Sequence, residues 1–124
     1  MTRVLVTAYC ICAMAAVELR ATDKPLLQKP PAKEMRRTNP YETRNGAEQA
    51  GKKLFRRECA SCHGQQGGGT ARAPALVSPV LKQTSAGAIF WVLRHGYLRR
   101  GMPSFSHLPE PQRWQIITYL KSLQ

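Results

Sequence analysis

Residues 59–64 read CASCHG, with Cys59 and Cys62 separated by two residues and His63 directly after the second cysteine. Two thiols at this spacing lie on one short turn. Three kinds of chemistry are open to such a turn: a zinc site, a redox disulfide, or thioether bonds to a haem whose iron binds the adjacent histidine. Each needs different neighbours, so the flanking sequence decides among them.

The flanking sequence favours haem. A structural zinc ion takes four ligands, usually from a second C-x-x-C or a histidine pair, and neither follows the motif. A thioredoxin-type disulfide sits between a strand and a helix, whereas this motif follows a predicted helix and precedes the glycine-rich loop Gly64 to Ala75. Haem attachment is therefore the leading prediction, and a zinc or disulfide module without haem is kept as an alternative.

Helical periodicity surrounds the motif. After Asn45, a candidate cap, apolar or small residues recur at helical spacing up to the cysteines: Ala47, Ala50, Gly51, Leu54 and Phe55. Thr84 or Ser85 can cap a second helix that ends near Gly96. Its apolar face comprises Ala88, Ile89, Val92 and Leu93.

A third helix is predicted over Trp114 to Leu123, after Pro109 and Pro111. Its inward face comprises Ile116, Ile117, Leu120 and Leu123. Because no stretch alternates as a strand does, we expect an all-α domain.

Met102 is the candidate for the second axial position of the iron. It is the only methionine after the motif and lies 39 residues beyond His63, between Gly101 and Pro103. This separation lets the chain wrap around the ring edge and return on its other face. A thioether ligand would close the iron and restrict it to electron transfer. His95 and His107 are rival ligands, and an ordinary core methionine is the alternative reading of Met102.

Together these residues resemble the class I monohaem cytochrome c family, in its short bacterial form. The resemblance covers about Ala47 to Leu123 and rests on four separated motifs. The N-terminal helix and haem turn carry Gly51, Phe55, Cys59, Cys62 and His63, and the other motifs are APAL at 73–76, GMPSF at 101–105 and IITYLK at 116–121.

The resemblance implies one covalently bound haem c in a fold of three to four helices. Cys59 and Cys62 would bind the ring, and His63 and Met102 would bind its iron. The Pro74 carbonyl would accept the N–H of the His63 imidazole, and Leu76 would pack on the ring. In the helix pair, Gly51 would allow close approach and Phe55 would meet Tyr119 or Leu120.

The N-terminus indicates export. An early Arg3, the apolar run from Val4 to Val17 and small residues near Ala15 are typical of a secretory signal peptide. The run is short for a membrane span, although an uncleaved anchor is the alternative. We therefore expect a signal peptide at 1–20, a linker rich in proline and charge at 21–45, and a cytochrome c domain at 46–124.

The charge indicates acidic partners. The 124-residue chain carries a net charge of +12, and the part from Asn45 onward carries 11 basic and 3 acidic residues, a net charge of +8. No nucleic-acid recognition pattern accompanies this charge. Arg94, Arg99 and Arg100, near the methionine loop, form either a docking patch, partners for the haem propionates, or a merely solvated face.

The sequence thus predicts a periplasmic c-type cytochrome that carries single electrons between larger redox proteins and is not an enzyme. Its donor and acceptor would present an acidic docking face, and membrane anchoring would require an uncleaved N-terminal segment. The alternative is a haem enzyme or a gas or redox sensor with an open or weakly held sixth position.

Overall fold

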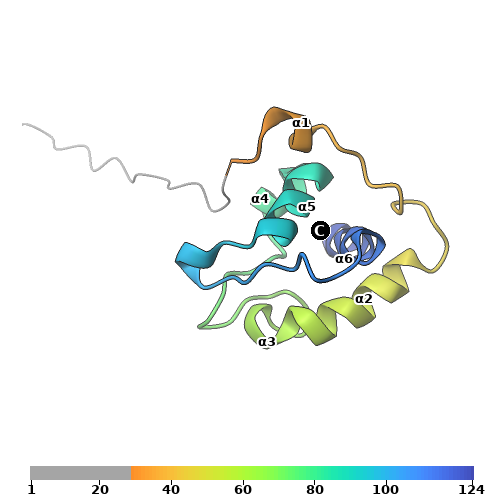
Figure 1. Ribbon diagram of the computed structural model, residues 1–124. Coiled ribbons are helices and arrows are strands. Elements are labelled where there is room, and N and C mark those ends of the chain that lie inside the picture. Colours follow the sequence, from red (N-terminus) through yellow and green to blue (C-terminus); the bar gives the residue numbers. More distant parts are fainter. Residues whose placement is uncertain (1–28) are drawn as a thin grey trace, which may run out of the picture.

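The computed structural model describes residues 29–124, so the predicted signal peptide and the start of the predicted linker lie outside the described residues. The elements are α1 (Ala32–Met35), α2 (Ala47–Glu58), α3 (Ala60–His63), α4 (Pro79–Gln83), α5 (Ala86–His95), the 3₁₀ turn η1 (Leu98–Arg100) and α6 (Glu110–Ser122) (Figure 1). Over this part of the chain there is no strand, only one isolated bridge between Tyr97 and Met102. The all-α prediction is confirmed.

The three longer helices are those that the apolar periodicity predicts, while α1, α3 and α4 span only four or five residues each. One turn of helix is too short to show a 3.6-residue repeat. None of the helices within residues 29–124 has the length and hydrophobicity needed to cross a membrane.

Two helix starts differ from the prediction. The N-cap of α2 is Gly46 in the left-handed region, at φ 78°, without a side-chain cap, so the prediction of Asn45 as the cap is wrong. Helix α6 begins at Glu110 rather than at Trp114, with a proline in its first turn, where the missing N–H costs nothing. In α5 the Ser85 hydroxyl accepts the predicted capping bond from the Ala88 amide at 3.2 Å.

Helices α2 and α6 form the central pair, drawn in yellow-green and blue (Figure 1). Gly51 allows their close approach, because a Cβ there would collide with the Gln115 carbonyl, 2.6 Å from its carbon, and lie 3.0 Å from the Tyr119 Cβ. One turn on, the Phe55 and Tyr119 rings meet at a centroid distance of 5.4 Å. The contact that the resemblance implies is therefore present.

Adding a methyl group at this crossing should be costly. In Gly51→Ala the obstacle is backbone, so the helices must separate, and we expect the haem-loaded protein to lose about 3 kcal/mol of unfolding free energy. Urea unfolding followed by circular dichroism measures this loss. Gly68→Ala is the control, since Gly68 has no positive φ and nothing within 4 Å of an added Cβ. Equal stability of the two variants would contradict the packing argument.

Residues 31–44 fall within the linker predicted at 21–45, yet they pack on α5 and α6. The Arg37 guanidinium lies 4.3 Å from the Phe90 ring centroid and donates to Glu110 at 2.5 Å. The buried Asn39 amide donates to the Trp114 carbonyl at 3.2 Å and to the Thr118 hydroxyl at 2.9 Å. Polar side chains make these contacts, so the spacing of apolar residues in the sequence does not indicate them.

Candidate haem site

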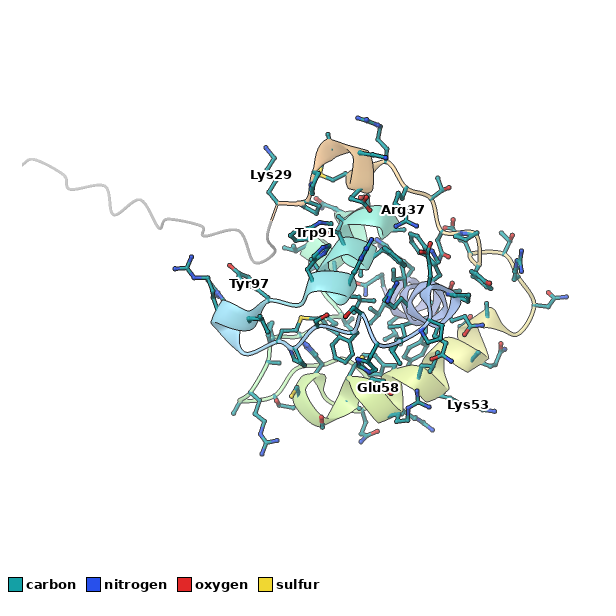
Figure 2. All side chains as sticks on the ribbon, in the orientation of Figure 1. Lys29, Arg37, Lys53, Glu58, Trp91 and Tyr97 are labelled. Carbon is teal, nitrogen blue, oxygen red and sulfur yellow. The ribbon has the colours of Figure 1, made fainter. Side chains whose placement is uncertain are left out.

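A cavity of about 760 Å³ lies between two groups of elements. One comprises the end of α2, α3 and the loop after α3, and the other comprises α5 and the segment after it. All six residues predicted for the site line this one cavity: Cys59, Cys62, His63, Pro74, Leu76 and Met102. Glu58 and Tyr97, labelled in Figure 2, line it from the two groups. The volume falls within the roughly 300–1,000 Å³ of cofactor pockets.

The two cysteines share one helical turn. The amides of Cys62 and His63 both donate to the Cys59 carbonyl, at 3.2 and 2.9 Å, which places both sulfurs and the imidazole beside the cavity. Cys59 is buried and Cys62 is half-buried.

The environment of Cys59 opposes the redox alternative. Burial raises the pKa of its thiol to about 12, and the neighbouring Glu58 carboxylate adds to the rise. The thiol therefore stays protonated at neutral pH. A redox-active C-x-x-C motif depends on the opposite shift, a lowered pKa that supplies a thiolate.

His63 is held in one orientation by the loop that follows it. Its Nδ1 lies 2.9 Å from the Pro74 carbonyl oxygen. Because a carbonyl can only accept, Nδ1 carries the hydrogen and the Nε2 lone pair is left for a metal. The loop is tied back to the cysteine turn by two further bonds, from the Gly69 amide to the His63 carbonyl at 2.8 Å and from the Thr70 hydroxyl to the Cys62 carbonyl at 2.5 Å.

Met102 lies on a tight hairpin at the end of α5. The amides of Tyr97 and Met102 each donate to the other's carbonyl, at 2.9 and 3.2 Å. Gly96 ends α5 directly before the hairpin, with φ 71°, and a Cβ there would lie 2.6 Å from the Pro103 carbonyl carbon. The methionine side chain is half-buried and packs against the core. The backbone is therefore fixed on both sides of Met102, which lines the cavity.

The two rival histidines differ in position. His95 does not line the cavity; its Nδ1 donates to the Trp91 carbonyl at 2.8 Å, and its ring lies 4.4 Å from the Trp91 ring. His107 does line the cavity, but its side chain is 61% exposed and its Nε2 lies 3.9 Å from a Glu58 carboxylate oxygen. His107 is thus the competitor that an experiment on Met102 must include.

The donor set fits haem better than zinc. Across residues 29–124, no group of three or more His, Cys, Asp or Glu side chains could hold a metal ion, whereas a structural zinc ion needs four ligands. A haem iron takes four donors from its own ring and needs only axial ligands from the protein. One oriented imidazole, one thioether and two thiols along a single cavity match that need.

An all-α domain with these groups around one cavity is a class I monohaem c-type cytochrome. Residues 46–120 match the family model for the cbb3-type cytochrome c oxidase subunit III, and the chain belongs to this family. The family's members are electron-carrying proteins with covalently attached haem c. A comparison with curated protein sequences found no significant match.

Two solved structures resemble the chain. Cytochrome cL from the marine methylotrophic bacterium Methylophaga aminisulfidivorans is 27% identical, with a TM-score of 0.60 over 68% of this chain. The c-type cytochrome XoxG from Methylobacterium extorquens is 28% identical, with a TM-score of 0.55 over 62% of this chain. The matched regions cover only 58% and 50% of those two chains.

Proposed function

We propose that the protein is an exported carrier that transfers single electrons between larger redox proteins and catalyses no bond-making step. One observation carries the proposal: the six predicted residues line a single cavity, and the His63 imidazole in it is oriented by the Pro74 carbonyl. A closed, six-coordinate iron is what such a carrier requires, since an open position would admit other ligands.

Each residue then has a separate task. Cys59 and Cys62 would retain the haem through thioether bonds, and His63 and Met102 would bind its iron from two sides. Pro74 would keep the imidazole in one tautomer and strengthen its donation to the metal. Leu76, half-buried on the cavity wall, would exclude water from the ring. When bound, the haem supplies the one-electron chemistry.

The surface near the methionine hairpin is the proposed docking face. Arg99 and Arg100 are exposed on η1, two or three residues from Met102, and Arg100 and Arg72 line the cavity. Leu98 beside them is 73% exposed. An apolar side chain among cations suits a transient complex with an acidic protein face, because charge steers the encounter and brief apolar contact completes it.

We place the protein in the periplasm, on the strength of the signal-like segment at 1–20. If that segment is retained instead of cleaved, it would anchor the domain to the membrane. Residues 31–44, which pack on α5 and α6, would then connect the anchor to that side of the domain. In either case the proposed donor and acceptor are redox proteins.

Electron exchange with small charged reagents tests the docking face without an identified partner. The rate with anionic hexacyanoferrate should fall as salt rises from about 10 to 200 mM, and it should fall about tenfold at low salt in the Arg99→Glu, Arg100→Glu variant. Stopped-flow spectroscopy measures both effects.

The matched control reverses Lys52 and Lys53, which are exposed on α2 and do not line the cavity (Figure 2, Lys53 labelled). This variant has the same net charge as the arginine variant and should react much faster. Identical rates for the two would mean that only total charge matters and would remove Arg99 and Arg100 from the docking face.

A further inference from the structure

Arg113, near the start of α6, is a buried cation without a carboxylate partner among the described residues. It is 7% exposed, and the nearby Glu110 carboxylate pairs with Arg37 instead. Its guanidinium lies over the Phe90 ring at 4.9 Å. Burying an unpaired charge is costly unless hydrogen bonds replace the lost water. The Arg113 Nη1 makes such bonds, whereas its buried Nε has no hydrogen-bond partner among the described residues.

Those bonds all go to one short segment. The Arg113 Nη1 donates to the carbonyl oxygens of Phe105, Ser106 and Leu108 at 3.3, 3.2 and 2.7 Å. This segment follows Met102 and has no helix or strand of its own, while Phe105 and Leu108 are buried. Backbone carbonyls that turn inward need donors, and here one side chain supplies them.

The segment is therefore held at two ends by two different helices. At its start, the Ser104 hydroxyl donates to the Arg94 carbonyl at 2.6 Å and the Phe105 amide to the Leu93 carbonyl at 2.8 Å, both at the end of α5. At its far end the segment leads into α6, and the side-chain hydrogen bonds that tie its carbonyls to this helix come from Arg113. Losing Arg113 would remove these hydrogen bonds and leave three inward-facing carbonyls without this donor, while the buried side chains of Phe105 and Leu108 still hold the segment.

We propose that Arg113 is a positioning residue that keeps the 103–108 segment, and through it the Met102 sulfur, in place against the haem iron. This inference rests on the proposed role of Met102 as an axial ligand. Arg113 would then limit how often the sulfur leaves the iron, in addition to stabilising α6.

Lys121 provides a matched comparison on the same helix. Its Nζ donates to the carbonyls of Leu81, Lys82 and Thr84 at 2.9, 2.9 and 2.6 Å. This is the same kind of contact, one cation on three carbonyls, but it holds the end of α4 and not the methionine segment. A purely structural role for Arg113 would make the two residues behave alike.

The test compares haem-loaded Arg113→Met and Lys121→Met with the wild type. Imidazole added to the ferric protein competes with the methionine, so its apparent affinity reports the fraction of molecules whose sulfur is off the iron. Arg113→Met should raise that affinity about tenfold, as expected for releasing buried acceptors, and weaken the near-infrared sulfur-to-iron band. Lys121→Met should change the affinity less than about twofold. Urea unfolding should show both variants to be less stable than the wild type, because each loses three hydrogen bonds to carbonyls.

Arg113→Lys should fall between the wild type and Arg113→Met, because an ammonium keeps the charge but not the planar geometry of the guanidinium. If Arg113→Met does not fold, Arg113→Gln replaces it in the same comparison. Equal imidazole affinity in the Arg113 and Lys121 variants would overturn the inference about Arg113. If the wild-type protein still shows the sulfur-to-iron band, the assignment of Met102 as a ligand would stand. A wild-type protein without the band would overturn both.

Discussion

Replacing Cys59 and Cys62 together by alanine should release essentially all of the haem into acid acetone, whereas the wild-type polypeptide should retain it. Both thiols line the cavity from one helical turn, and two thioether bonds to the ring would survive the loss of every non-covalent contact in acid. Absorbance of the extract and of the precipitated protein measures the division of haem between them.

The exposed Ser61 between the two cysteines gives the matched control, since Ser61→Ala alters the same turn without a thiol. Haem that extracts freely from the wild type or from Ser61→Ala would refute covalent attachment. The double cysteine variant stripped of haem should also lose most of its helicity, because a cavity of about 760 Å³ then lies empty beside a small core.

Met102→Ala should convert a closed iron into an open one. Without the thioether we expect the ferric near-infrared band to vanish and ferrous protein to bind carbon monoxide. The reduction potential should fall by on the order of 0.1 V, a fraction of the roughly 0.8 V over which axial ligands tune haems, because a thioether stabilises ferrous iron. Optical spectroscopy and redox titration measure the three effects.

Two further variants make this result specific. Met35→Ala removes a methionine that is 39% exposed and does not line the cavity, so it should leave the spectrum unchanged. His107→Ala removes the competing histidine of the cavity wall and should also keep the band. A Met102→Ala protein that stays closed at unchanged potential, with His107→Ala open to carbon monoxide, would show that His107 is the ligand.

The residues predicted for the site lie along one cavity, and three of them are close in sequence because covalent haem attachment needs two thiols and a histidine on one turn. Cys59, Cys62 and His63 share one turn, so their proximity is visible in the sequence. Met102 is identified only as the one methionine after the motif, and its place on the cavity wall depends on tertiary contacts of the hairpin and of the segment after it. The helices α2, α5 and α6 are likewise visible in the repeat of apolar side chains. The contact between Phe55 and Tyr119 required the family resemblance, since periodicity alone does not pair helices.

What the sequence misses depends on polar groups acting in tertiary contacts. Asn39 and Arg37 attach an apparently linker-like segment to α5 and α6 through an amide and a guanidinium. Arg113 belongs to none of the motifs in the sequence, yet it is buried and donates to three carbonyls. The bond from Thr70 to the cysteine turn also has no sequence signal, because it depends on how the loop closes.

The most direct test of the closed-iron electron carrier is the optical spectrum of the wild-type protein, taken ferric and then ferrous under carbon monoxide. Ligation by His63 and Met102 predicts low-spin spectra in both states, a sulfur-to-iron band in the ferric form and no change when carbon monoxide is added. A high-spin ferric spectrum, or a ferrous spectrum that shifts under carbon monoxide, would contradict this account and favour a haem enzyme or sensor with an open sixth position.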